Sequence, residues 1–119
     1  MNIYYNPEKF GLSIFAYIQF IPDSYEFNTI VVWIDKNKDL FWYHDSGCSC
    51  NTPFDNVGLE SLFPIKRSAV LNEIENICID SRNSRGDPAL DKQLIFMDKI
   101  KKHLQHIKKN KKRKPRITA

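Results

Sequence analysis

Residues 27–35, which read Phe-Asn-Thr-Ile-Val-Val-Trp-Ile-Asp, decide the fold of this chain. Five of these nine residues are β-branched, and the run from Ile30 to Ile34 is apolar at every position. β-Branched and aromatic side chains favour strands, and a strand that is apolar on both faces is typical of the centre of a sheet. We therefore expect a central strand here.

Two further strands are expected, one on each side of this segment in the sequence. Residues 12–19 alternate with the period of a strand, and the aliphatic face consists of Leu12, Ile14, Ala16 and Ile18. Residues 40–44 follow the polar hairpin loop 35–39 and are expected to form the third strand. Because successive strands with short connections tend to pair, we expect an antiparallel meander.

Two amphipathic helices are expected after the strands. The first falls within residues 65–80, where apolar side chains recur at helical spacing, namely Val70, Leu71, Ile74, Ile77 and Cys78. Asp87 and Pro88 are residue types preferred at the start of a helix, and an apolar stripe follows at Leu90, Leu94, Met97, Leu104 and Ile107. Burial of these stripes against the sheet predicts an α+β fold with two layers: a three-stranded antiparallel meander covered on one face by two C-terminal helices.

The net charge of +4 conceals two parts of opposite sign. Residues 1–98 carry 8 basic and 14 acidic side chains, whereas residues 99–119 carry 10 basic and no acidic ones. Because like charges repel and proline interrupts a helix, we expect the last helix to fray beyond residue 110 and to end by Pro115. We therefore divide the chain into one domain, residues 1–107, and a basic disordered tail, residues 108–119.

This basic end is the main candidate binding site. Lysine and arginine neutralise phosphates without reading sequence, and the candidate residues are Lys101, Lys102, Lys108, Lys109, Lys111, Lys112, Arg113, Lys114 and Arg116. The tail has no aromatic side chain on which a base could stack. We expect a nucleic acid or the acidic surface of another protein as the partner. A purely solubilising tail is the alternative.

The turn-rich residues 45–58 contain a second candidate site. Four nitrogen and sulfur ligands suit a structural zinc ion, and the chain offers His44, Cys48, Cys50 and Cys78. In the other interpretation, which we favour, Cys78 is a small core residue and the other two cysteines are partly buried thiols. We accordingly expect no cofactor, with structural zinc as the alternative.

Enzymatic activity and membrane insertion are not expected. The chain contains no nucleophile elbow, phosphate-binding loop or Cys-x-x-Cys pair, and no residues arranged for acid–base chemistry. No run of 18 apolar residues exists to span a bilayer. An odd number of cysteines and the lack of a secretory signal predict a cytoplasmic protein with reduced thiols.

Three segments together resemble a family of small uncharacterised bacteriophage proteins. They are the opening Met1–Leu12, the strand Val31-Val32-Trp33, and the loop Asp45-Ser46-Gly47-Cys48-Ser49-Cys50 with Pro53-Phe54 after it. The resemblance covers about residues 1–65 and implies phage origin and the cytoplasm of an infected bacterium, but no catalytic residue. It leaves a second interpretation open, in which the cysteine loop and an exposed sheet face inhibit or redirect a host protein.

Overall fold

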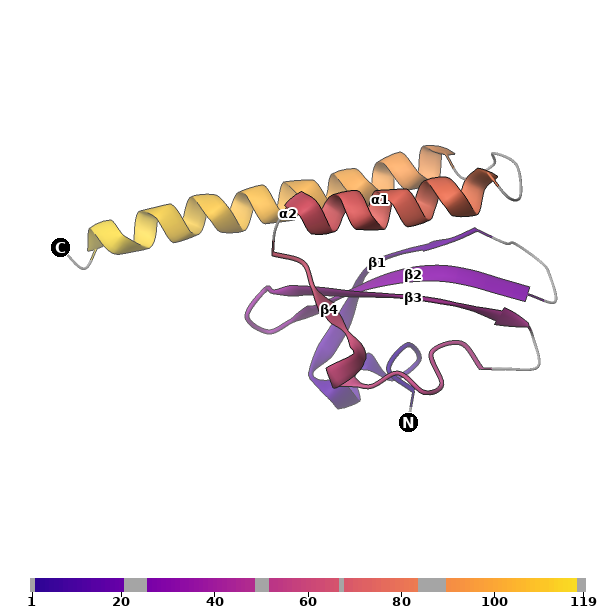
Figure 1. Ribbon diagram of the computed structural model, residues 1–119. Helices are drawn as coiled ribbons and strands as arrows, with labels where there is room; N and C mark the ends of the chain where they lie inside the picture. Colours follow the sequence, from indigo (N-terminus) through magenta and orange to yellow (C-terminus); the bar gives the residue numbers. More distant parts are fainter. Residues whose placement is uncertain (1, 21–25, 49–51, 67, 84–89, 118–119) are drawn as a thin grey trace.

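The computed structural model describes residues 2–20, 26–48, 52–66, 68–83 and 90–117, with side chains for residues 2–20, 27–47, 52–66, 69–81 and 90–107. Figure 1 shows a twisted sheet with both α-helices on one face. The elements in chain order are η1 (Pro7–Phe10), β1 (Leu12–Gln19), β2 (Glu26–Asp35), β3 (Leu40–Cys48), η2 (Leu59–Ser61), β4 (Phe63–Pro64), α1 (Ser68–Asn83) and α2 (Leu90–Ile117).

The sheet is antiparallel throughout, with strand order β1-β2-β3-β4. The predicted α+β class and the order of strands and helices are confirmed, but the predicted number of three strands is wrong. The fourth strand has two residues and pairs Phe63 with Trp42 and Pro64 with Phe41. A strand this short has no detectable period, and its proline is tolerated because β4 is an edge strand in this sheet.

Strand β3 is longer than expected, because residues 45–48, which we placed in the loop, continue the ladder. They pair with β2 as far as Glu26, opposite Cys48. Asp45, Ser46 and Gly47 are residue types that strands disfavour. Pairing with the central strand satisfies their backbone groups and overrides that preference.

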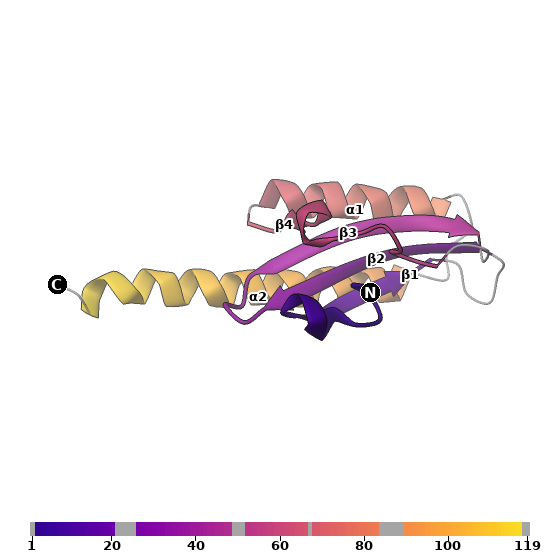
Figure 2. The ribbon, with the colours of Figure 1, turned by 90° about the horizontal axis from the view of Figure 1, so that it is seen from below.

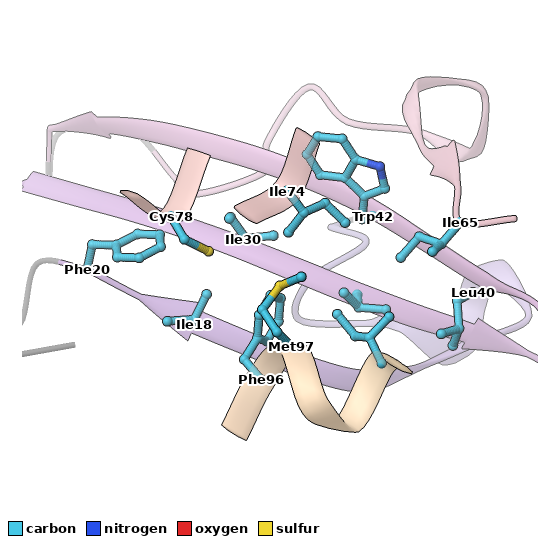
Figure 3. Close-up of a cluster of buried hydrophobic side chains, with 12 residues drawn as sticks. Ile18, Phe20, Ile30, Leu40, Trp42, Ile65, Ile74, Cys78, Phe96 and Met97 are labelled. Carbon is cyan, nitrogen blue, oxygen red and sulfur yellow. The ribbon is translucent and has the colours of Figure 1, made fainter. Parts of the chain in front are cut away.

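The helix-side core lies between the sheet and the two helices. The central strand contributes Ile30 and Val32, and β3 contributes Leu40 and Trp42. Figure 3 shows Ile30, Leu40 and Trp42 meeting side chains from both helices, namely Ile74, Cys78, Phe96 and Met97. Val32 and Ile100 belong to the same cluster. Helix α1 buries its predicted stripe against the sheet. On α2 the prediction is wrong in part, because the face that meets the sheet passes through Phe96, Met97, Ile100 and Leu104, and this leaves Leu90 and Leu94 of the predicted stripe exposed.

A second core covers the opposite face, so the predicted two-layer architecture is incomplete. This far-side core consists of Ile3, Leu12, Val31, Trp33, Phe54, Val57 and Leu62. Its cover comes from the N-terminal segment and from residues 52–62, which lie below the sheet in Figure 1. The indole Nε1 of Trp33 donates a hydrogen bond to the Ile3 carbonyl at 3.1 Å. Because β2 is apolar on both faces, both faces need a cover.

Strand β1 changes face part-way along its length. The register with β2 shifts between Ile14 and Ala16. A β-bulge of this kind inserts one unpaired residue and exchanges the two faces of the strand beyond it. Leu12 and Ile14 consequently belong to the far-side core, whereas Ala16 and Ile18 pack against the helix-side core. The prediction that these four residues share one face is wrong for this reason.

Helix α2 is longer than predicted and continues to Ile117, beyond both residue 110 and Pro115. Lysine and arginine are good helix formers, and their charges complement the carbonyl end of the helix dipole. A proline this near the end removes only one backbone donor from the last turn. Figure 1 shows that the C-terminal part of α2 extends past the sheet and past α1. The division of the chain at residue 107 stays a prediction.

The two tryptophans provide a matched test of the far-side core. Both indoles are buried, but in the part of the chain that the structure describes the Nε1 of Trp42 has no hydrogen-bond partner, whereas that of Trp33 binds Ile3. Trp33→Phe leaves a buried carbonyl unpaired, so we expect it to lower the free energy of unfolding by about 1–3 kcal/mol more than Trp42→Phe. Urea unfolding of both variants measures the difference, and equal losses would contradict the role of the Trp33 hydrogen bond.

Candidate functional site

The first two predicted anion-binding residues, Lys101 and Lys102, lie on the exposed surface of α2. The Nζ of Lys102 is 2.9 Å from the Oδ2 of Asp98, and both side chains are largely exposed to solvent. An exposed ion pair one helical turn apart contributes at most about 1 kcal/mol. Lys102 can therefore exchange this carboxylate for another anion at little cost.

The other seven predicted residues are Lys108, Lys109, Lys111, Lys112, Arg113, Lys114 and Arg116. Their backbone belongs to α2, and their side chains lie outside the described part. Successive residues of a helix are turned by about 100° around its axis. A nearly uninterrupted basic run therefore occupies backbone positions all around α2, in the part that extends past the sheet in Figure 1.

Lys99 has a different position from the rest of the basic run. Its Nζ donates to the backbone carbonyl of Phe15 at 2.6 Å and lies 4.7 Å from the centroid of the Phe15 ring. Phe15 is the residue at the bulge of β1. Lys99 thus connects α2 to the first strand, a contact that sequence reasoning missed because the bulge leaves no signal in the alternation.

His103 makes a second connection between α2 and the sheet. Its Nε2 lies 2.8 Å from the backbone carbonyl of Lys38, in the hairpin between β2 and β3. Its ring centroid is 5.0 Å from that of Phe15. Together with Lys99 it fixes α2 along β1, so the helix enters its basic segment from an anchored position.

The proposed metal ligands are only partly within the described residues. His44 is on β3, and its Nε2 lies 2.6 Å from the Oδ1 of Asn28. Cys78 is fully buried on α1 in the helix-side core. Cys50 and the side chain of Cys48 lie outside the described residues. Among the residues that the structure describes, no three histidine, cysteine or acidic side chains are grouped to hold a metal ion, and the zinc site stays a prediction.

His44 belongs to a polar network beneath α1. Asn28 accepts from the histidine ring and donates through its Nδ2 to the Oγ of Ser81 at 3.2 Å. Because the amide oxygen can only accept, the Nε2 of neutral His44 carries the proton. Burial lowers the pKa of His44 below its ordinary value of 6.5, and the nearby carboxylate of Asp45 opposes this shift in part.

The loop after β3, which the structure describes over residues 52–58 and which we call the central loop, is tied to the sheet by Asp45 of β3. Its Oδ2 accepts from the backbone N–H of Phe54 at 2.8 Å, and its Oδ1 accepts from the N–H of Ser46 at 3.0 Å. Phe54 is fully buried and has a φ of 62°, a conformation that non-glycine residues rarely adopt. Asp45 therefore stabilises the strained turn at Phe54, and the side chain of Phe54 fills the far-side core.

The N-terminal opening meets the same turn. The Nδ2 of Asn2 donates to the carbonyl of Pro53 at 2.8 Å, while its Oδ1 accepts from the backbone N–H of Tyr4 at 2.7 Å. The ring of Tyr4 lies 5.2 Å from that of Phe54. The opening and the Pro53-Phe54 motif, which are distant in sequence, are thus one structural unit.

These features define a small α+β domain with an antiparallel four-stranded sheet, two covering helices and a basic helical extension. The chain belongs to the family described as "Domain of unknown function (DUF7574)", whose sequence profile matches residues 1–110. No curated protein and no solved structure matches the chain. In the described part of the chain, neither α-helix has the length and apolar character needed to cross a bilayer.

The pH dependence of stability tests the His44 network. Because the pKa of His44 is lower in the folded state, the unfolded state binds more protons, and stability is lost as the pH falls below about 6.5. We expect the urea midpoint to decrease between pH 7.5 and 5.5 in the native sequence and to decrease less in His44→Gln. Identical pH profiles for the native protein and His44→Gln would contradict the assignment.

The hydrogen bond between Asp45 and the backbone N–H of Phe54 can be tested by substitution. Asp45→Ala removes the acceptor of the Phe54 N–H and should lower the free energy of unfolding by about 1–3 kcal/mol. Asp45→Asn keeps a side-chain oxygen and should lose less. Chemical unfolding of both variants measures this order, and a larger loss in Asp45→Asn would contradict it.

Proposed function

We propose that this protein is a non-enzymatic accessory protein of a bacteriophage, acting in the cytoplasm of the infected cell, and that the basic end of α2 binds nucleic acid through its phosphates. One observation carries the proposal. After Asp98 the chain has ten basic residues and no acidic residue, and those as far as Arg116 lie on one helix that extends past the sheet.

The length of this helix suits a polyphosphate chain. Residues 99–116 span roughly 27 Å at the rise of an α-helix. Duplex DNA carries about one phosphate charge per 1.7 Å along its axis. The basic segment can therefore lie against many phosphates at once, and each charge that it neutralises releases a counterion and favours binding.

The charge distribution supports binding by α2 rather than by the sheet. Residues 1–98 carry a surplus of six acidic side chains, from 14 acidic and 8 basic. An acidic body repels phosphates, so the proposed contact is confined to the helix that leads away from it. Residues 99–119 contain no Phe, Tyr or Trp, which supports binding without base recognition.

Salt dependence with two charge-matched variants tests the proposal. The first is Lys111→Gln with Lys112→Gln and Lys114→Gln, and the second is Lys9→Gln with Lys36→Gln and Lys66→Gln, on the body. Both variants lose three positive charges. Fluorescence anisotropy with a short DNA duplex should show a salt slope smaller by about 2–3 for the first variant and nearly unchanged for the second. Equal effects of the two variants, or no binding by the native protein at low salt, would overturn the proposal.

A second candidate is a module that binds a host protein and inhibits or redirects it. The observation that favours it is the exposure of apolar side chains on α2, where Leu94 and Ile95 are 58% and 70% exposed. Such residues lower solubility unless they meet a partner. Pull-down from bacterial lysate separates the candidates, because nuclease treatment releases a partner held through nucleic acid and does not release a directly bound protein.

A further inference from the structure

The groove between β1 and α2 lies beside the proposed nucleic-acid site and shares Lys99 with the basic run of α2. On the strand side it is lined by residues 14–19, which are consecutive, and on the helix side by Lys92, Ile95, Phe96 and Lys99. Its volume is about 730 Å³. A groove formed by one sheet edge and one helix is a shape in which an extended peptide can lie.

The edge of β1 presents backbone groups for pairing. Among the strands that the structure describes, β1 stands at one end of the sheet and pairs with β2. The N–H of Phe20 donates to the carbonyl of Asn28 across that pair at 2.8 Å. Because successive residues of a strand direct their backbone groups to opposite sides, the N–H and carbonyl of Tyr17 point away from β2. An edge of this kind is a template for another strand.

The helix side of the groove is basic at both ends and apolar between them. Lys92 and Lys99 are seven residues apart, roughly 10 Å along the helix, and Ile95 lies between them. The ammonium of Lys99 is held at the strand by the carbonyl of Phe15. Each lysine follows an acidic residue in the sequence, Asp91 before Lys92 and Asp98 before Lys99. Asp98 pairs with Lys102 and lines the groove on the α1 side of the helix, and neither aspartate is among the residues that line the groove beside β1.

We propose that the edge of β1 binds an extended acidic segment of a partner protein as a fifth strand of the sheet. Carboxylates four residues apart in that segment would meet Lys92 and Lys99, and an apolar side chain midway between them would meet Ile95. Alternate side chains of a strand share one face, and positions four apart are separated by about 13 Å. Lys99 is held at the strand, and the exposed, flexible side chain of Lys92 can make up the difference. The exposed ring of Tyr17, at 59% exposure, borders the strand on its other face.

The positive charges of Lys92 and Lys99 favour an acidic segment over a second copy of the chain. A two-fold pairing of β1 with its own copy would bring Lys92 and Lys99 towards the same lysines of the other copy, and like charges repel. An acidic segment meets the same lysines with attraction. The acidic peptide site does not depend on nucleic-acid binding by the basic end of α2, and it would supply the surface for the second candidate function.

The probe is the acetylated and amidated peptide Thr-Glu-Thr-Val-Thr-Glu-Thr, which places both glutamates and the valine on one face. We expect it to shift the backbone amide signals of residues 14–19 in an NMR titration. The isomer Thr-Glu-Val-Thr-Glu-Thr-Thr has the same composition but divides its glutamates between the two faces, and it should bind several-fold more weakly. If about 1 mM peptide produced no shifts, the proposal would be overturned. The Lys99 contact and the bulge would then serve to protect the edge of β1 from pairing.

N-Methylation of the peptide tests strand addition without altering the protein. Methylation of every second amide blocks one edge of the peptide, and methylation of the intervening amides blocks the other. We expect one of these two peptides to bind like the parent and the other to lose tenfold or more of its affinity, since only one edge pairs with β1. Equal affinities of the two methylated peptides would overturn the added-strand geometry.

Charge exchange tests the two lysines. Lys92→Glu with Lys99→Glu should prefer Thr-Lys-Thr-Val-Thr-Lys-Thr to the glutamate peptide, in reverse of the native order. Lys92→Glu alone keeps the Lys99 contact with Phe15 and should weaken glutamate-peptide binding about threefold. Lys9→Glu with Lys36→Glu is the charge-matched control and should keep the native preference for the glutamate peptide. If this control reversed its preference as the Lys92→Glu, Lys99→Glu variant does, the proposed site would be overturned.

Two further measurements distinguish the proposed site from peptide binding at the basic end of α2 and from pairing with a second copy of the chain. The variant with Lys111→Gln, Lys112→Gln and Lys114→Gln should bind the glutamate peptide as the native chain does, and loss of binding would place the peptide on the basic end of α2 instead. Sedimentation of the native chain should show a monomer. A dimer that Tyr17→Pro dissociates would assign the edge to a second copy and overturn the proposal.

Discussion

The structure depends on one constraint, which is that the central strand β2 has to be buried on both faces. Ile30 and Val32 point to one side, Val31 and Trp33 to the other, and none of the four is exposed. Removal of apolar surface from water is the main favourable term in folding. The helices cover one face, and the N-terminal segment with the central loop covers the other (Figure 2). Each of these segments is held in place because it buries apolar surface of β2.

This constraint gives a structural role to the N-terminal opening and to the Pro53-Phe54 motif. The central loop reaches the far-side core because Phe54 fills it, and Asp45 stabilises the unusual backbone of Phe54. The opening reaches the same place through Asn2 and through the Ile3 carbonyl that binds Trp33. These residues of the two motifs are used in packing, and the binding surfaces proposed above lie on α2 and on the edge of β1.

Helix α2 combines three roles along one length. Its inner side, with Phe96, Met97 and Ile100, closes the helix-side core. Lys99 and His103 attach it to β1 and to the β2–β3 hairpin. Beyond these anchors the helix carries only basic charge and leads away from an acidic body. A rigid attachment at one end and a uniform charge at the other make α2 suited to presenting cations to a partner.

The sequence by itself determined the three longer strands, the two helices and the separation of acidic from basic charge, because each of these is a local pattern repeated over many residues. Only the tertiary structure decided the bulge near Phe15, the two-residue strand β4, the burial of Phe54 and the position of Lys99. A one-residue shift and a two-residue pairing are too short to have a period. Their stability comes from contacts between residues distant in sequence, and these contacts exist only once the sheet has formed.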